Sequence, residues 1–102
     1  MRSHDYFVYL LTNRTDGTLY CGVSNDLLRR LSEHRAGQVD SFTRKYNCHH
    51  LVWFEHHSDV TEAIRREKRI KKWNRAWKLR LIEESNPGWR DLAEGLGFEK
   101  LR

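Results

Sequence analysis

The sequence is poor in the residues that mark several large classes of protein. It has 2 cysteines and 1 proline among 102 residues, and Cys21 and Cys48 form no C-x-x-C pair. Neither a disulfide framework nor a cysteine-built zinc site is therefore expected. No apolar run approaches the roughly 20 residues that cross a bilayer, and the first residues lack the apolar stretch of a secretory signal. We expect a cytoplasmic protein that is not associated with a membrane.

The positive charge is concentrated in one segment. The content of 38% hydrophobic residues supports one modest core, so we expect a single domain over residues 1–102. The net charge is +5, but the segment from Arg65 to Arg80 holds nine basic residues against one acid, Glu67, and carries +8. A concentrated basic patch attracts phosphate backbones, whereas a solvated helix face is the alternative. The local density favours nucleic acid, DNA or RNA, as the partner.

The N-terminal quarter of the chain predicts a β-hairpin. Residues 6–11 and 18–23 are rich in aromatic and branched side chains, and turn-forming residues separate them. With a loop over residues 13–16, Tyr9 would pair directly with Tyr20, and the two rings would lie on the same face of the sheet. A slip of one residue would place them on opposite faces.

The rest of the chain predicts one more strand and several helices. The expected elements are a helix over about 26–35, a polar stretch, a strand over 51–55, helices over about 59–73 and 75–83, and a short helix over 89–95. The order is ββαβααα. The predicted fold class is α/β (α+β), a small three-stranded antiparallel sheet flanked by helices.

Polar residues occupy inward positions on two of the predicted helices. In the first helix, Arg30 and His34 are one turn apart and lie beside the buried stripe of Leu27 and Leu31. We expect both to point toward the sheet or into a cleft at its edge. In the second helix, Glu67 stands where the apolar pattern requires another apolar residue.

An inward carboxylate such as Glu67 is costly unless it is paired or binds a metal ion. One interpretation is an ion pair with Arg30 or Lys71. The other is a single-carboxylate site for Mg²⁺ or Mn²⁺, because such an ion keeps several waters and takes further ligands from a phosphate. Residue type and spacing leave both interpretations open.

These residues come from four separate elements, and because each can be placed on a face that looks inward toward a common region, together they form a candidate catalytic set. Phosphodiester hydrolysis needs a base that activates water, a cation near the phosphate oxygens and stabilisation of the leaving oxygen. The tyrosines alone would be explained equally well as a stabilising aromatic pair without function. The candidate catalytic residues are Tyr9, Tyr20, Arg30, His34 and Glu67.

The set also resembles a known family. Val8-Tyr9, followed eleven residues after that tyrosine by Tyr20-Cys21-Gly22, resembles the two half-motifs of the GIY-YIG nuclease superfamily. The resemblance spans almost the whole chain and is closest to small stand-alone, single-domain bacterial members. The match is extended by Asp26-Leu27-x-x-Arg30-Leu31-x-x-His34, by Glu67 in Ala63-Ile64-Arg65-Arg66-Glu67-Lys68, and by Asn86-Pro87-Gly88-Trp89.

The resemblance implies a divalent-metal-dependent endonuclease that cleaves DNA by attack of water, as in DNA repair or recombination. Tyr20, slightly favoured over Tyr9, would act as the base or orient the nucleophile. Arg30 would bind the scissile phosphate, and His34 would assist proton transfer or contact the phosphate. Glu67 would hold Mg²⁺ or Mn²⁺.

Some features depart from the pattern of the family. Phe7 replaces the usual glycine of the first half-motif, and Cys21 replaces the usual isoleucine of the second. An asparagine is common about three turns beyond the glutamate, where this chain has Lys78. The alternatives are therefore a non-catalytic nucleic-acid-binding module on the same scaffold, or a basic surface that docks on an acidic protein.

Larger relatives usually take sequence specificity from an additional recognition domain, which this sequence does not contain, so we expect weak intrinsic specificity or dependence on a partner. The sequence does not indicate an oligomeric state, and a monomer is the default. The candidate nucleic-acid-binding residues are Arg30, Arg44, Lys45, Lys68, Lys71, Lys72 and Lys78.

Overall fold

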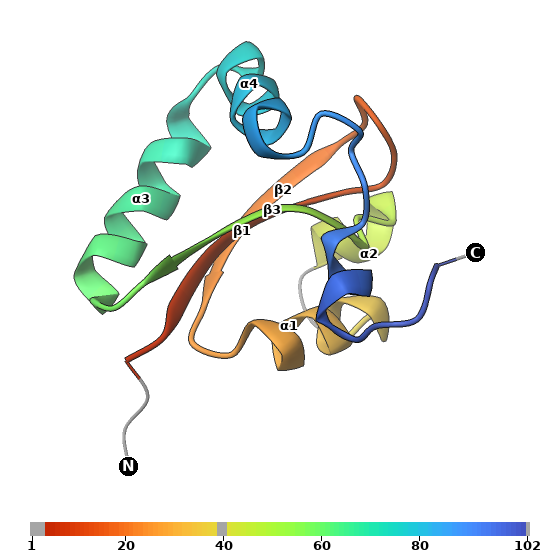
Figure 1. Cartoon of the computed structure of the whole chain (residues 1–102), viewed down its shortest axis with the longest axis horizontal. Coiled ribbons are helices and arrows are strands. Elements are labelled where there is room, and N and C mark those ends of the chain that lie inside the picture. Colours follow the sequence, from red (N-terminus) through yellow and green to blue (C-terminus); the bar gives the residue numbers. More distant parts are fainter. Residues whose placement is uncertain (1–3, 39–40, 102) are drawn as a thin grey trace.

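The computed structural model describes residues 4–38 and 41–101 and has a three-stranded antiparallel sheet at its centre (Figure 1). The order of the strands is β2-β1-β3, so the expected fold class is confirmed. The helix α2 was not expected, because its sequence reads only as a polar stretch. In chain order the elements are β1 (Tyr6–Thr12), β2 (Leu19–Ser24), α1 (Leu27–Arg35), α2 (Ser41–Tyr46), β3 (His50–His57), α3 (Val60–Lys72), α4 (Arg75–Ser85) and the 3-10 helix η1 (Leu92–Leu96).

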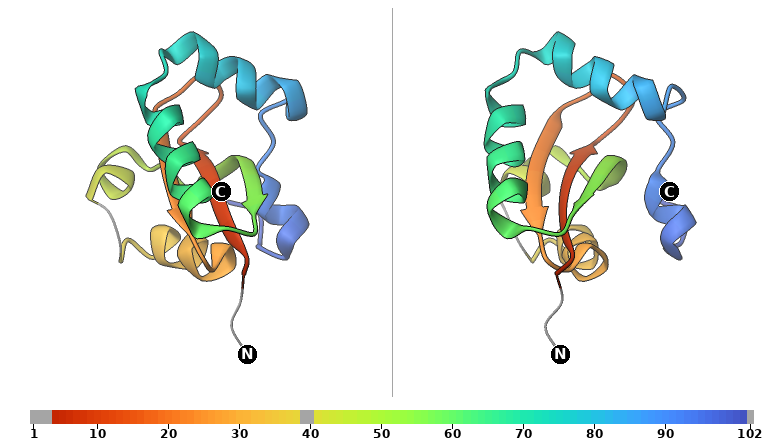
Figure 2. Two further views of the ribbon diagram at one scale, coloured as in Figure 1. Left: turned by 90° about the vertical axis from the view of Figure 1, so that its left-hand side faces the viewer. Right: turned by 60° about the vertical axis from the view of Figure 1, so that its left-hand side comes forward.

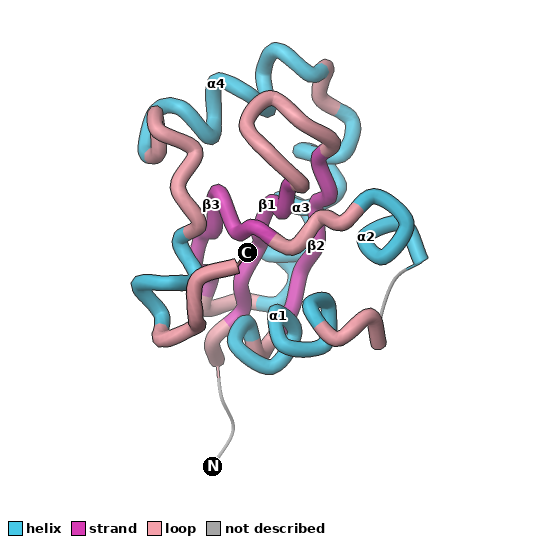
Figure 3. The backbone as a smooth tube through the Cα atoms, turned by 90° about the vertical axis from the view of Figure 1, so that its right-hand side faces the viewer, coloured by secondary structure: helices cyan, strands magenta, loops and turns pink. Residues whose placement is uncertain are grey.

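The central strand β1 is covered on both faces, which explains its continuous apolar sequence. Val8 and Leu10 belong to one buried cluster, together with residues of α3 and α4. Tyr9 and Leu11 belong to a second buried cluster, with residues of α1 and η1 packed on the opposite face. Figure 2 shows α3 against one side of the sheet, and Figure 3 looks onto the other side, with α3 behind the strands.

The hairpin register differs from the predicted one by two residues. Tyr9 pairs with Gly22, and Tyr20 pairs with Leu11, so the tyrosines are diagonal neighbours and not a direct pair. The loop between the strands runs over residues 13–18 because the Asn13 side chain accepts a hydrogen bond from the Thr18 amide at 3.0 Å and closes a wider turn. A shift of two residues preserves the side of each side chain, so both tyrosines still lie on one face.

The helix α1 has well-defined ends. Asp26 caps its first turn by accepting a hydrogen bond from the Arg29 amide at 3.1 Å. At the other end, Gly37 has a positive φ of 71°, and the amides of Gly37 and Gln38 donate to carbonyls of the last turn at 3.1 and 2.9 Å. This Schellman ending requires the left-handed conformation that glycine adopts without strain.

The C-terminal segment returns to the edge of β3 and packs beside it. The Asp91 carboxylate accepts a hydrogen bond from the Leu51 amide at 3.0 Å and pairs with Arg35 at 2.8 Å. The buried Asn86 side chain donates to the carbonyl of Val52 at 3.1 Å. These contacts attach α1 and the C-terminal segment to β3. Within the described part of the chain, no helix combines the length and apolar character needed to cross a bilayer.

Candidate functional site

A buried chain of polar groups links β1, α1 and α2. The Tyr9 hydroxyl lies 3.0 Å from His34 Nε2, and His34 Nδ1 lies 3.0 Å from Thr43 Oγ1. All three side chains are buried, so these contacts satisfy groups that would otherwise be costly to remove from water. The sequence did not indicate Thr43 as a site residue, because a threonine in a polar stretch carries no signal until the helix α2 brings it to His34.

Tyr20 lies beside this chain on the same face of the sheet. Its ring centroid is 6.4 Å from that of Tyr9 and 5.3 Å from that of His34. Gly22 provides the space between them, since an added Cβ would lie 2.5 Å from the Tyr9 hydroxyl and 3.1 Å from the Tyr20 ring. The glycine therefore allows the Tyr9 ring to lie across β2, with its hydroxyl directed to His34.

Arg30 lies at the edge of the sheet, in a more open environment than His34. Its guanidinium is partly exposed and approaches Glu33 at 3.6 Å, a loose ion pair on the surface of α1. Arg30 lines a hollow of about 290 Å³ together with Val23 of β2 and Ile64 of α3, among other residues. Of the two positions expected for Arg30, the structure shows the cleft at the edge.

Glu67 lies on the inward side of α3, and its side chain is only 13% exposed. Its carboxylate pairs with Lys71 Nζ at 2.8 Å, which was one of the two partners considered from the sequence. The expectation that all five candidate residues face one common region needs correction. The helix α3 covers the face of the sheet opposite to Tyr9 and Tyr20, because successive side chains of β1 point to opposite faces.

The surroundings of the two groups of residues meet along the edge strand β2. The Cys21 thiol lies 4.0 Å from the Glu67 carbonyl, the Tyr9 hydroxyl lies over Gly22, and Val23 shares its hollow with Arg30. Three consecutive residues of the edge strand thus lie next to residues of both groups: Cys21 next to Glu67, Gly22 next to Tyr9, and Val23 next to Arg30. We call this arrangement the β2 edge site; it comprises Tyr9, Tyr20, Arg30, His34 and Glu67.

Glu67 provides the carboxylate of the β2 edge site. Within residues 4–38 and 41–101, no three His, Cys, Asp or Glu side chains gather as a metal-binding group. Burial, followed by the negative charge of Glu67, raises the pKa of the Cys21 thiol to about 12. Cys21 is therefore a neutral, buried thiol at neutral pH, as expected for a small apolar residue rather than a nucleophile.

Apart from Arg30, the predicted nucleic-acid-binding residues fall into two groups. Arg44 and Lys45 lie on α2, beyond Tyr20, and both are exposed. The second group lies along α3 and the start of α4, where Lys78 Nζ donates to the carbonyl of Lys71 at 3.4 Å. The members of the second group are Lys68, Lys71, Lys72 and Lys78.

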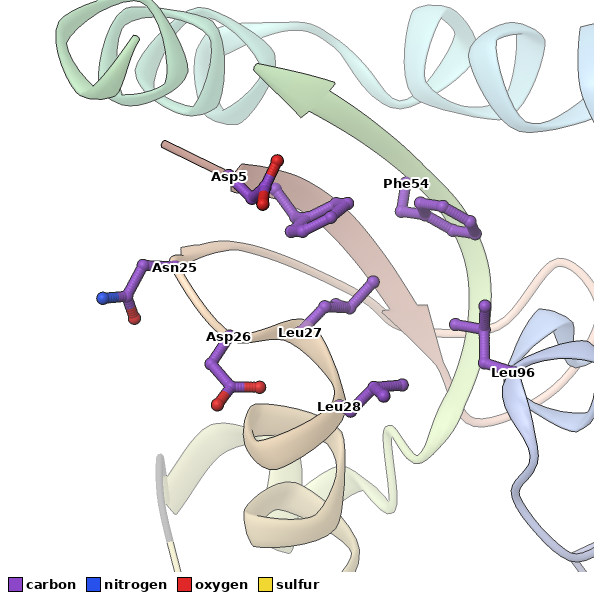
Figure 4. Close-up of a pocket in the computed structure, with 8 residues that line it drawn as sticks. Asp5, Asn25, Asp26, Leu27, Leu28, Phe54 and Leu96 are labelled. Carbon is purple, nitrogen blue, oxygen red and sulfur yellow. The ribbon is translucent and has the colours of Figure 1, made fainter. Parts of the chain in front are cut away.

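A separate apolar hollow of about 510 Å³ lies between α1, β1, β3 and η1 (Figure 4). Phe54, Leu28 and Leu96 line it, and Asp26 at its rim is the capping residue of α1. None of the residues of the β2 edge site lines this hollow. The hollow is therefore separate from the candidate catalytic residues at β2.

Comparison with known proteins identifies the family of the chain. The model of the GIY-YIG catalytic domain matches residues 5–80. UPF0213 proteins of Staphylococcus aureus strains Mu50 and N315 are each 40% identical over 84 residues, which cover 82% of this chain and 99% of theirs. The solution NMR structure of a UPF0213 protein from Bacillus halodurans is 27% identical, with a TM-score of 0.55, and the match covers 88% of this chain and 95% of that one. The chain therefore belongs to the GIY-YIG family, a family of nuclease type.

Proposed function

We propose that this protein is a divalent-metal-dependent endonuclease that hydrolyses phosphodiester bonds in DNA with weak intrinsic sequence specificity. The observation that carries the proposal is that a buried tyrosine–histidine pair and an inward glutamate flank one edge strand, β2, from its two faces, with an arginine in the hollow beside Val23. Membership in a nuclease-type family supports the class of reaction. The concentration of basic residues on α3 and α4 supports a nucleic acid as the substrate.

Tyr20 is the proposed general base, and Tyr9 is proposed to position it. The Tyr20 side chain is only partly buried, so a water molecule can reach it, whereas the Tyr9 side chain is buried. Tyr20 would orient the attacking water and take its proton. Tyr9 would fix the inner side of the site, because its hydroxyl already contacts the His34 ring.

His34 is proposed to hold the tyrosine side of the site in one arrangement. In the tautomer with hydrogen on Nδ1, that group donates to Thr43 Oγ1 and leaves Nε2 to accept from the Tyr9 hydroxyl. The partner on one ring nitrogen thus sets the role of the other. In this arrangement His34 supports proton transfer through the tyrosines, and Thr43 is the positioning residue behind it.

Arg30 is proposed to bind and neutralise the scissile phosphate. Its ion pair with Glu33 is long, at 3.6 Å, and lies on the surface, where such pairs contribute little. A phosphate can therefore compete for the guanidinium with two charge-assisted hydrogen bonds. The position of Arg30 beside Val23 would direct that phosphate toward the open edge of β2.

Glu67 fits the requirements of a single-carboxylate site for Mg²⁺ or Mn²⁺. Its side chain is largely shielded, and its partner Lys71 is 51% exposed, so the lysine can move to solvent or to a phosphate. Such an ion is commonly held by one or two carboxylates together with waters and substrate phosphates. When bound, the ion supplies positive charge at the phosphate oxygens. Glu67 would hold it through its carboxylate.

The basic residues on the two sides of β2 define a proposed path for the DNA backbone. Arg44 and Lys45 lie on the Tyr20 side, and the lysines of α3 and α4 lie on the Glu67 side. Lys78 approaches Lys71 on that second side and stands near the position where many relatives are expected to carry an asparagine. We propose that Lys78 contacts a phosphate next to the cleaved bond.

The proposal is tested by nicking of supercoiled plasmid in the presence of Mg²⁺ or Mn²⁺. Wild-type protein should nick the plasmid, whereas Glu67→Gln and Tyr20→Phe should lose most of this activity. Glu62→Gln is a matched control, because Glu62 also pairs with a basic residue on α3 but is well exposed. Equal nicking by all four proteins, or no nicking by the wild type with either metal, would refute the proposal.

A second candidate function is a nucleic-acid-binding module without turnover. The +8 charge between Arg65 and Arg80, together with Lys78 in place of an asparagine, favours it. It predicts binding that weakens steeply with salt and with Lys71→Glu or Lys72→Glu, but no metal-dependent cleavage. Failure to bind any nucleic acid at low salt would leave an acidic protein surface as the remaining partner for the basic helices.

A further inference from the structure

Two exposed aromatic side chains on α2 continue outward from the tyrosines of the site. The Phe42 ring centroid lies 6.2 Å from that of Tyr20, and the Tyr46 centroid lies 4.8 Å from that of Phe42. Together with Tyr9, these rings form a continuous series from the buried sheet to the surface. Phe42 is 38% and Tyr46 39% exposed. We call Phe42 and Tyr46 the aromatic step.

The aromatic step is held in a defined position by Thr43, the residue that follows Phe42 on α2. Thr43 points inward to His34, and its carbonyl accepts a hydrogen bond from the Cys48 amide at 3.0 Å. Phe42 and Tyr46 are one helical turn apart and therefore lie on one side of α2. The contact that orients His34 also fixes the step beside Tyr20.

Positive charge surrounds the aromatic step. Phe42, Arg44, Lys45 and Tyr46 line a shallow hollow of about 480 Å³. Lys45 Nζ lies 5.3 Å from the centroid of the Tyr46 ring. Aromatic faces next to cationic side chains are the usual means of binding single-stranded nucleic acids, in which bases stack on the rings and phosphates pair with the cations.

We propose that Phe42 and Tyr46 form a stacking subsite for one unpaired nucleobase, with its phosphate held by Arg44 and Lys45. The inference rests on the proposed function, because it places the subsite directly beside the Tyr20 that would act on the strand. In a duplex both faces of an internal base are covered by its neighbours, so a base must leave the stack to reach the step. The preferred substrate is therefore DNA with an unpaired nucleotide next to the scissile phosphate.

The test is binding without metal, which separates it from cleavage. Fluorescence anisotropy in EDTA compares a labelled single strand, a duplex with a single-stranded flap and a blunt duplex. Replacement of both rings, Phe42→Ala with Tyr46→Ala, should weaken binding to the first two ligands about tenfold or more and leave the blunt duplex unchanged. A 2-aminopurine base in the single strand should lose fluorescence on binding to the wild type and keep it with the variant.

Two further variants make the test specific. Phe42→Leu keeps an apolar side chain against Tyr20 but removes the stacking face, so it should reproduce most of the loss without affecting folding. Trp77→Ala is the matched control, because Trp77 is 52% exposed within the basic helix α4, far along the chain from α2. It should leave the ratio of single-strand to duplex binding unchanged.

An unchanged ratio in the Phe42 and Tyr46 variants, or an equal loss for all three ligands, would overturn the inference even if the plasmid is nicked. Conversely, a protein that never nicks the plasmid but loses single-strand binding in these variants would refute the endonuclease and retain the subsite.

Discussion

The two faces of the sheet hold their polar groups by different means. On the face of α1 and α2, Tyr9, His34 and Thr43 are buried and joined by two contacts of 3.0 Å. On the face of α3, Glu67 pairs at 2.8 Å with a lysine that is half exposed. Buried, satisfied networks rigidify a structure, whereas exposed ion pairs are weak and easily exchanged.

This difference implies that the two sides of the β2 edge site have different roles. The tyrosine side is organised before any ligand arrives, as electrostatic and positional catalysis require. The Glu67 side is held by a partner that can move, so a metal ion and a phosphate can replace Lys71. Activity should therefore depend on both sides, but folding stability should depend mainly on the tyrosine side.

The largest expected effect is a loss of activity, without a loss of folding stability, when Arg30 or Glu67 is replaced. Arg30→Ala and Glu67→Gln should each reduce the rate of plasmid nicking by about 100-fold to 1,000-fold, the range seen when one charge-stabilising group is removed. Their free energies of unfolding should stay within about 1 kcal/mol of the wild type, because each removes only a partly exposed ion pair. Nicking rates and urea unfolding curves measure the two quantities. A marked loss of stability in Glu67→Gln would show that this side is also a structural element.

The second effect should be a loss of folding stability when the buried contacts of Tyr9, His34 and Thr43 are broken. His34→Ala opens a cavity and leaves the Tyr9 and Thr43 hydroxyls without their shared partner, so we expect a loss of about 3 kcal/mol of unfolding free energy. Chemical denaturation followed by circular dichroism measures it. His49→Ala is a useful control, since His49 is a partly buried histidine of the same region outside the site. A His34→Ala protein as stable as the control would contradict the comparison.

The sequence predicts these two sides to different degrees. The inward position of Glu67 follows from helical periodicity, and the shared face of Tyr9 and Tyr20 follows from strand alternation. Both patterns are local and survive small errors in register. The direct pairing of the tyrosines was predicted wrongly, because the turn depends on how the Asn13 side chain hydrogen-bonds across the loop.

Features that depend on contacts between different elements could not be predicted from the sequence. The helix α2 is short and polar, and Thr43 acquires its role only when it meets His34, nine residues away. The placement of Glu67 and the tyrosines on opposite faces also depends on which side of the sheet α3 takes. Periodicity identifies an inward face of a helix but does not show which face of the sheet it covers.

A third effect should appear where the two sides meet. An added methyl group in Gly22→Ala would lie 2.5 Å from the Tyr9 hydroxyl, so the tyrosine must move away from His34. We expect a loss of about 1–3 kcal/mol of stability from overpacking, together with reduced nicking. Gly95→Ala is the matched control, because an added Cβ there has no neighbour within 4 Å. Equal melting temperatures for both variants would show that Tyr9 can relax without consequence.

The smallest effect should concern the stability of the fold at high pH. Two buried cysteines, one on each face of the sheet, should contribute to it to different degrees. Burial raises the pKa of Cys21 to about 12 and that of Cys48 to about 11, from the ordinary thiol value of 9.0. Above pH 9 the unfolded chain therefore loses thiol protons that the folded chain retains, and stability falls as pH rises. Because the pKa of Cys21 is raised further, Cys21→Ala should flatten the decline in melting temperature between pH 9 and 11 more than Cys48→Ala does. Melting curves at matched ionic strength would measure it. A larger effect of Cys48→Ala would mean that the α3 side of the sheet opens to solvent more readily than the burial of Cys21 indicates. In that case both the Glu67–Lys71 ion pair and the strand β2 below it would be mobile.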